Sequence, residues 1–492
     1  MAQFPSIKVK AFFMRLLVAL GVKSFHSTVK DMTEGKPIRL MIGFSIPLLF
    51  SNALQMLFVV ADTAIIGHIL GVNAFASIGA TASPHWLVFS AVLGFSQGLS
   101  TLFAQRFGAK DMDGLKRAFV SAGYMAAVLG IILAVTGVLI CKPLMELLQT
   151  PRELIGGSVT YLSWLWAGMP LFIGYNLLAM TLFALGNSRT PLFAVGVATA
   201  VNIAFDFILI VPFGIAGVAI ASLISQVAAM LFCYRALRKT GVFQGCGFRF
   251  DSKSAWPLLR LALPLGLRNA VIEVGGLLVQ RYVNMYGTEF VAGVAVAKRM
   301  YSLLMIAGGA IEASVATFVA QNFGAKQLER VRNGLKDGIK LAIGSALVIM
   351  AIALPLGRQI LGLLIGGDTA QVNAVLDVGV RQLNLLALGL PFLYLLFMYR
   401  AALQGLGNTF IPMLSGFVEL GLRIVSVLVI TRFLGDLGVL LSDPIAWPFA
   451  MTLLVVSYFI VFRRIRKRRE NAGTYAAASP PDPALPPPGT NP

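Results

Sequence analysis

Five acidic residues stand inside long apolar stretches of the sequence, where a charged group would have to enter a lipid bilayer. They are Asp62, Asp206, Glu273, Glu312 and Glu419. On membrane-insertion scales an acidic side chain at the bilayer centre costs roughly 2.5 to 3.5 kcal/mol, so each one needs a partner or a function. Carboxylates in such positions are typical of proton and cation pathways and of substrate sites.

Asp62 and Asp206 are the two acids whose surroundings best fit the binding of a proton or a cation. Gln55 shares a helix face with Asp62, and Asn202 lies one turn before Asp206. The two expected helices run in the same direction, so their aspartates should lie at similar depth and meet. Two carboxylates in a low-dielectric site repel when both are ionised, so the pair would take up a proton or a cation such as Na⁺. The alternative is that each aspartate is neutral and hydrogen-bonds a neighbouring helix.

Glu273 belongs to a second polar stripe, which it shares with Asn269 and Gln280 on one helix face. We expect this stripe to bind a substrate or a second cation. A purely structural pairing of Glu273 with Arg281 or another basic residue is the competing interpretation. The side chains that we further expect to line a cleft between helices are Gln55, Asn176, Arg281 and Arg400.

The other two acids have basic residues at helical spacing. Glu419 precedes Arg423 by four residues, the favourable order for an ion pair within one helix, and we predict that pair. Glu312 has Lys298 or Arg299 as a candidate partner. Because basic residues are frequent on the expected helices of the second half, an anionic substrate stays open.

The elements that carry these residues are predicted to be membrane-spanning helices. Hydrophobic residues make up 57% of the 492 residues and charged residues only 12%, and the mean hydropathy is +0.81. The apolar runs are continuous over roughly 20 residues or more, which favours helices over alternating barrel strands. We expect twelve spans, at 39–66, 77–102, 119–140, 157–184, 192–212, 214–236, 257–286, 291–319, 335–365, 379–403, 410–433 and 440–462.

The net charge of +19 follows the expected topology of these spans. With both chain ends on one side, nearly all lysine and arginine residues outside the helices lie on that side. The opposite side has Lys142, Arg152, Arg358 and Arg432. This distribution predicts cytoplasmic N- and C-termini in a bacterial inner membrane. It also explains the basic excess without a nucleic-acid partner, as affinity for anionic lipid headgroups.

An internal repeat divides the chain into two halves. The segment 104–110 (AQRFGAK) recurs at 320–326 (AQNFGAK). Each half would hold six helices, so the halves are related by a parallel pseudo-twofold axis and enclose a central cleft suited to alternating access. A channel and a structural bundle also fit a repeat. The expected divisions are an interfacial arm over 1–36, lobes over 37–236 and 257–462, a cytosolic linker over 237–256, and a disordered tail over 463–492.

The sequence lacks the motifs expected of an ATP-driven transporter, a metal-binding protein or an enzyme. The sequence has no phosphate-binding loop of the Gly-x-x-x-x-Gly-Lys-Ser/Thr type, so ATP is not the expected energy source. The three cysteines and three histidines have no metal-ligand spacing, and no membrane-embedded nucleophile and histidine suggest an enzyme. We therefore expect a monomeric transporter of a small molecule, driven by an ion gradient and without a cofactor.

Several motifs together resemble the MATE (multidrug and toxic compound extrusion) family, and most closely its DNA-damage-inducible F branch. They are Pro47, 61–67 (ADTAIIG), 78–80 (IGA), both segments ending in FGAK, 185–191 (LGNSRTP) and 202–206 (NIAFD). The resemblance covers roughly residues 37–462. It implies an antiporter that exports amphipathic, often cationic drugs in exchange for H⁺ or Na⁺.

The resemblance also implies roles for single residues. Asp62, Asn202 and Asp206 match the coupling site of the first lobe, and Glu273 matches the glutamate of a second cation site. The aspartate that accompanies this glutamate in such relatives has no counterpart near Leu393. The competing functions are a lipid-linked precursor flippase of the same superfamily and an exporter of an anionic metabolite.

Overall fold

The structure is a computed structural model that describes the backbone of residues 29–365 and 369–478. Within these ranges the side chains of residues 57–64, 369 and 472–478 are not described. The expected interfacial arm therefore lies outside the described residues up to residue 28, as does the end of the expected tail. The side chain of Asp62 also lies outside them, although its backbone belongs to a described helix.

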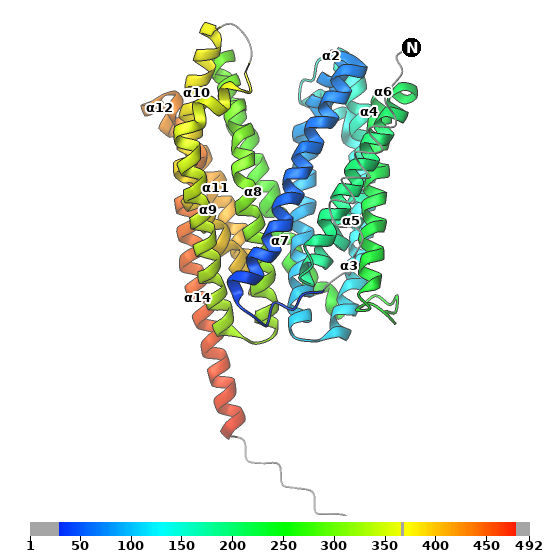
Figure 1. Cartoon of the computed structure of the whole chain (residues 1–492), viewed down its shortest axis with the longest axis vertical. Helices are drawn as coiled ribbons and strands as arrows, with labels where there is room; N and C mark the ends of the chain where they lie inside the picture. Colours follow the sequence, from blue (N-terminus) through cyan, green and yellow to red (C-terminus); the bar gives the residue numbers. More distant parts are fainter. Residues whose placement is uncertain (1–28, 366–368, 479–492) are drawn as a thin grey trace, which may run out of the picture.

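All secondary-structure elements of the described chain are helices, and they form two consecutive groups (Figure 1). The first group comprises α2 (Pro37–Gly108), α3 (Met112–Leu147), α4 (Arg152–Ala167), α5 (Met169–Ala184) and α6 (Arg189–Lys239). The second group comprises α7 (Ser252–Val283), η2 (Asn284–Tyr286), α8 (Thr288–Gly324), α9 (Leu328–Gly362), α10 (Thr369–Gly405), α11 (Phe410–Val425), η3 (Ser426–Ile430), α12 (Thr431–Leu434), α13 (Asp436–Leu440) and α14 (Ser442–Ala478).

Twelve membrane spans can be traced in these helices. Ten described segments are long and apolar enough to cross a bilayer, and the pair α4 and α5, bent by 46°, gives an eleventh. The 51 residues of α6 would extend far beyond a bilayer about 30 Å thick if they formed one straight helix. Instead the chain turns at Gly214 and folds back, since a side chain on Gly217 would collide with the backbone of Leu209. Dividing α6 there gives the twelfth span.

The same backbone turns occur in both halves at the offset of the sequence repeat. Gly71, which breaks α2, has φ 79° and ψ −177°, and Gly287 has φ 89° and ψ 172°. Gly214 has φ 55° and ψ −131°, and Gly435 has φ 60° and ψ −135°. These positive φ angles favour glycine, which has no Cβ to clash. The predicted internal duplication and the all-α, two-lobe fold are therefore confirmed.

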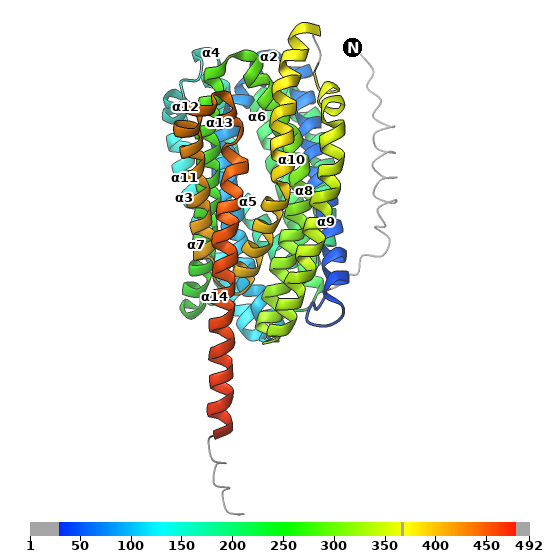
Figure 2. The ribbon, with the colours of Figure 1, turned by 90° about the vertical axis from the view of Figure 1, so that its left-hand side faces the viewer.

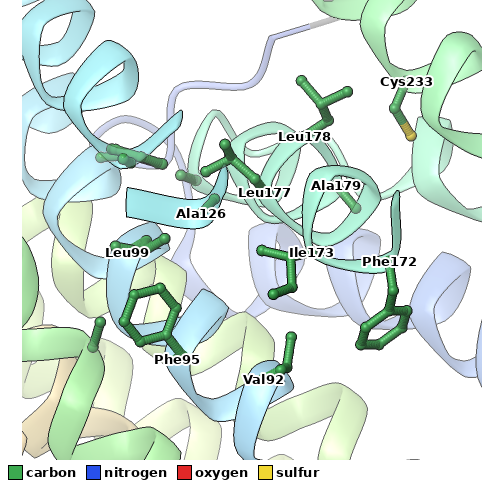
Figure 3. Packing of buried hydrophobic residues seen from close by; sticks show 14 of the residues in the cluster. Val92, Phe95, Leu99, Ala126, Phe172, Ile173, Leu177, Leu178, Ala179 and Cys233 are labelled. Atoms are coloured by element: carbon green, nitrogen blue, oxygen red, sulfur yellow. The ribbon is translucent and has the colours of Figure 1, made fainter. Parts of the chain in front are cut away.

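Each half has its own apolar core. The first includes Val92, Phe95 and Leu99 of α2 packed against Phe172 and Ile173 of α5 (Figure 3). The second is built around α8, α9, α10 and α14, and it also takes in Met41, Phe44 and Leu48 from the start of α2. The first span of the chain therefore begins against the second half and crosses to its own half, as the dark blue helix in Figure 1 shows.

The two halves contact each other most closely on the side where Lys110 and Lys326 lie, called the loop side below. Small residues allow this approach, because a side chain on Gly98 would collide with the backbone of Ala262, and one on Gly108 with that of Gln321. Away from the loop side the ribbons of the two halves diverge (Figure 1). Helix α14 continues past the loop side, beyond the rest of the bundle (Figure 2), so residues 463–478 of the expected disordered tail are helical instead.

Candidate functional site

The first polar centre is the pair Asn202 and Asp206 on the first arm of α6. Both residues are 0% exposed. With its amide oriented to satisfy both neighbours, Asn202 donates from Nδ2 to Asp206 Oδ2 at 2.9 Å and accepts from the Ser222 amide at 3.3 Å. Ser222 lies on the returning arm of the same helix, so the hairpin at Gly214 positions the pair. The spacing of four residues that the sequence indicated does bring these two side chains together.

The helix that carries Asp62 reaches the same level as this pair. Ile66, one turn after Asp62, and Ile210, one turn after Asp206, belong to one buried apolar cluster. Because Ile66 and Ile210 follow the two aspartates at the same spacing and lie in one cluster, the turns that carry Asp62 and Asp206 lie at similar depth. The coupling site of Asp62, Asn202 and Asp206 stays a prediction, because the Asp62 side chain is not described.

The second polar centre joins the two halves between α7 and the second arm of α2, which follows Gly71. The Trp86 indole donates to Glu273 Oε1 at 3.0 Å, and Asn269 Nδ2 donates to the Ser90 carbonyl at 2.8 Å. Glu273 and Asn269 thus share the face of α7 that meets α2. Gln280 has different partners: it accepts from Lys298 Nζ at 3.1 Å and donates to Asn284 at 2.9 Å.

Aromatic rings continue from this centre into the first half. Trp86 is 50% exposed and stacks on Phe89 with ring centroids 5.2 Å apart. Phe89 in turn stacks on Phe172 of α5 at 4.1 Å. A cation placed here could contact both the ring face of the half-exposed indole and the neighbouring carboxylate.

Arg268, next to Asn269, is a buried base at the same interface. Its guanidinium donates to Asn269 Oδ1 at 2.8 and 3.0 Å and to Gln97 Oε1 at 3.4 Å. The side chain is 4% exposed, and its Nη1 has no hydrogen-bond partner among the described residues. The interface therefore contains a buried basic group as well as the Glu273 carboxylate.

The predicted ion pair of Glu419 with Arg423 is wrong. Glu419 accepts from Arg400 Nη2 of α10 at 2.5 Å, and Arg423 pairs with Asp443 of α14 at 2.7 Å. All of these side chains are at least four-fifths buried, and the shortest contacts come from neighbouring helices rather than from the next turn. Asp443 was missed because it stands at the polar edge of an apolar run; an acid directly before a proline there was the available signal.

Other pairings and cleft positions also differ from expectation. Glu273 bonds to Trp86 instead of Arg281. Glu312 forms no ion pair with Lys298 or Arg299 in the part of the chain described, and the basic groups that interact with it are Arg268 and Arg400. Two residues expected to line the cleft, Arg400 and Asn176, are instead buried.

Arg400 is held by Glu419, and Asn176 donates to the Phe172 carbonyl of its own helix at 2.9 Å. Burial removes both from an open cleft, whereas Gln55 and Arg281 are exposed. Among the described side chains, which do not include Asp62, no three histidine, cysteine or acidic residues cluster in a way that could hold a metal ion.

Comparison with known proteins places this architecture in a family. The family model described as MatE matches residues 47–208 and 264–429, one segment in each half. A probable multidrug resistance protein, YoeA of Bacillus subtilis, is 28% identical over 447 residues, covering 87% of this chain and 94% of that protein. An FAD transporter of Shewanella oneidensis is 26% identical over 314 residues, covering 62% of this chain and 68% of that protein.

Solved structures agree with the fold. A crystal structure of MATE in complex with MaL6 superposes with a TM-score of 0.81 at 21% identity, covering 89% of this chain and all of that one. A MOP superfamily transporter from Pyrococcus furiosus gives a TM-score of 0.80 at 20% identity, covering 89% and 98%. With both halves matched by the family model, the chain belongs to the MatE family of multi-pass membrane transporters.

Proposed function

We propose that the chain exports amphipathic, mainly cationic compounds in exchange for H⁺ or Na⁺, by alternating access between its two lobes. The names of relatives such as YoeA, and of the multidrug export protein MepA of Staphylococcus aureus, support drug export. The observation that carries the coupling is the fully buried Asn202 and Asp206 pair, at the depth of the turn that holds Asp62.

Protonation at this pair would change its hydrogen bonds. An ionised carboxylate only accepts, and the Asn202 amide suits it as a donor. A protonated carboxyl group also donates, so it can find a new acceptor on a neighbouring helix. Since Asp206 lies on a hairpin and Asp62 on the helix that begins against the other lobe, uptake of a proton or Na⁺ can alter how the lobes meet.

The contact between the lobes would be the place of substrate binding. Trp86 and Phe89 supply ring faces and Glu273 supplies negative charge, the features that recognise a flat organic cation. The loop side, which we assign to the cytoplasm from the charge distribution, is closed by close backbone contacts. The arrangement therefore corresponds to the state that releases substrate outside.

The experiment is dye uptake into everted membrane vesicles, where export carries the dye into the lumen, with an imposed pH gradient and separately with a Na⁺ gradient. Asp62→Asn and Asp206→Asn should each abolish the acceleration by the coupling gradient while retaining dye binding. Glu146→Gln is the matched control and should transport normally, because Glu146 is exposed and its carboxylate pairs with Lys142 of the same helix at 4.0 Å. Normal coupling in both aspartate variants contradicts the proposal, and the gradient that drives the wild type identifies the ion.

Export of an anionic metabolite is the second candidate. The relative named FAD transporter supports it, as does buried Arg268, whose Nη1 has no hydrogen-bond partner among the described residues. The same vesicles should then accumulate FAD rather than a cationic dye, and Arg268→Gln should reduce that uptake. If neither compound is transported but a lipid-linked oligosaccharide crosses the membrane, the flippase alternative applies.

A further inference from the structure

The linker between the two lobes is held against the surface of α3. The Tyr124 hydroxyl donates to the Phe248 carbonyl at 2.7 Å, and Lys116 Nζ donates to the Gln244 carbonyl at 2.8 Å. Ser121 Oγ accepts from the Asp251 amide at 3.0 Å. These bonds fix the segment that leads into α7 alongside the first lobe, so side chains from both lobes meet there.

Two adjoining depressions on the loop side follow this linker, with volumes of about 430 and 480 Å³. Both are lined by Arg117 of α3, Asp251 and Lys253 at the start of α7. The basic side chains along them are Arg106, Lys116, Arg117, Arg249 and Lys253, and the acidic ones are Asp113 and Asp251. The excess of basic groups favours an anion.

The acids near these depressions leave part of that charge uncompensated. Arg106 is paired with Asp111 at 2.6 Å, and Arg117 lies 3.8 Å from Asp251. Arg249 and Lys253 are exposed and form no ion pair among the described side chains. Arg249 stands on the linker and Lys253 directly after it, and both line the second depression.

Large aromatic side chains around the linker are exposed on the surface. Phe248 is 88% exposed, Trp256 70% and Phe250 47%. In water this surface would be costly, whereas aromatic residues are favourable at the boundary between lipid and water. Their position indicates that the linker lies at that boundary.

Two lipid-facing stripes lead away from these aromatic residues. On α3 the exposed apolar residues that follow Tyr124 include Val128, Ile131 and Val135, and on α7 those that follow Trp256 include Leu259, Leu263 and Leu267. Both stripes have helical spacing and continue into the membrane. A molecule at the linker would thus meet basic groups on its water side and apolar surface on its lipid side.

We propose that this linker site binds an anionic phospholipid, with its phosphate headgroup among Arg117, Arg249 and Lys253 and its acyl chains along α3 and α7. Clusters of basic residues beside membrane helices have this affinity. The apolar stripes favour a lipid over a free phosphate, which could not use them. Because Arg117 belongs to the first lobe and Lys253 begins the second, the bound headgroup would link the two lobes.

The test is native mass spectrometry of the full-length protein in detergent, titrated with phosphatidylglycerol or phosphatidylcholine. Wild type should retain phosphatidylglycerol preferentially. Arg117→Gln/Arg249→Gln/Lys253→Gln should weaken its binding at least tenfold, since a basic side chain near an anionic surface contributes roughly fivefold. If the triple variant does not fold, the double variant Arg249→Gln/Lys253→Gln replaces it. This variant changes only exposed residues and should show a smaller loss of phosphatidylglycerol binding.

The matched control is Arg332→Gln/Lys336→Gln/Lys340→Gln, which removes the same charge from the equivalent end of α9, where no linker is present. Its affinity should stay within about twofold of wild type. An equal loss in this control overturns the proposal, because binding would then follow net charge alone. Displacement of the lipid by glycerol 3-phosphate at similar concentration also overturns it, since the ligand would be a soluble phosphate.

Discussion

Gln321 accepts a hydrogen bond from the backbone amide of Met32 at 2.8 Å and donates another to the Ala184 carbonyl at 2.7 Å. The Gln321 side chain on α8 is fully buried, and so is Met32, which precedes the first membrane helix. Ala184 ends α5 of the first lobe. One amide therefore ties the segment before α2 and the first lobe to the second lobe, on the loop side.

Gln321→Ala should destabilise this closed side. It leaves a buried amide and a buried carbonyl without partners, which costs about 1 to 3 kcal/mol for each such group. Because both bonds cross between parts that must separate for alternating access, the opened state should become more populated. The unfolding temperature in detergent should fall. A Thr101→Cys reporter at the contact between the lobes, in a cysteine-free background, should be alkylated faster.

The control for that experiment is Gln327→Ala. Gln327 is exposed at the start of α9 and makes no side-chain bond to cap that helix. It should leave both the unfolding temperature and the alkylation rate unchanged. Equal behaviour of the two variants contradicts a role of Gln321 in closure.

The ion pair of Arg400 and Glu419 is expected to be necessary for the stability of the second lobe. Glu419→Ala leaves Arg400 charged and buried, and loss of one partner of a buried ion pair costs about 3 to 5 kcal/mol. Asp377→Ala breaks an equally short pair with Arg358 at 2.6 Å, but both side chains are at least half exposed, so it should cost no more than about 1 kcal/mol. Unfolding in detergent measures both.

A compensating variant distinguishes charge from packing at this pair. Arg400→Met/Glu419→Leu removes both charges and keeps apolar bulk, so it should recover most of the stability that Glu419→Ala loses. A double variant as unstable as the single one would show that the loss comes from packing rather than from the unpaired charge.

The helices, the duplication and the Asn202 and Asp206 pair could be predicted from the sequence because they depend on local spacing. Apolar length sets a membrane helix, and residues four apart share a face. The positive φ angles at Gly71 and Gly287 also follow from a repeat that keeps glycine at matching turns. The branch within the family stays a prediction.

Contacts between helices could not be predicted in the same way. Glu419 had Arg423 at the right spacing, yet packing brings Arg400 closer. The bond of Trp86 to Glu273 joins residues 187 positions apart on different lobes, so no periodicity reports it. A partner across helices is set by the tertiary arrangement, in which a buried charge takes the nearest group that satisfies it.

The acid at the start of α3 gives a pH prediction outside the membrane. The Asp111 carboxylate accepts from the Gly114 amide at 2.9 Å, and this bond, with Arg106 beside it, holds the Asp111 pKa below its ordinary value of 3.8. A lowered pKa stabilises the folded state above the unfolded value, and that stability is lost as the pH falls through the folded value. Asp111→Asn keeps the acceptor but removes the charge.

Wild type should therefore unfold at a higher temperature than Asp111→Asn at pH 6, and the difference should shrink as the pH is lowered below about 4. Scanning fluorimetry of both proteins in detergent from pH 6 to pH 3 measures it. A difference that grows on acidification contradicts the assigned role of the charge.

Glu273 offers a test of substrate charge at the lobe interface. Glu273→Gln keeps an oxygen acceptor for the Trp86 indole but removes the negative charge. If the carboxylate attracts a cation, the KM for a cationic dye should rise roughly tenfold, because one charge interaction in a partly desolvated site contributes about 1 to 2 kcal/mol. A neutral compound of similar shape should keep its KM.

Trp86→Phe makes the complementary change at this contact. It removes the hydrogen bond to Glu273 and keeps a ring face for stacking on Phe89. Freed from the indole, the carboxylate should still attract the cation, so the KM should change less than in Glu273→Gln. The opposite order, with the larger loss in Trp86→Phe and none in Glu273→Gln, would assign recognition to the indole and leave Glu273 a positioning residue.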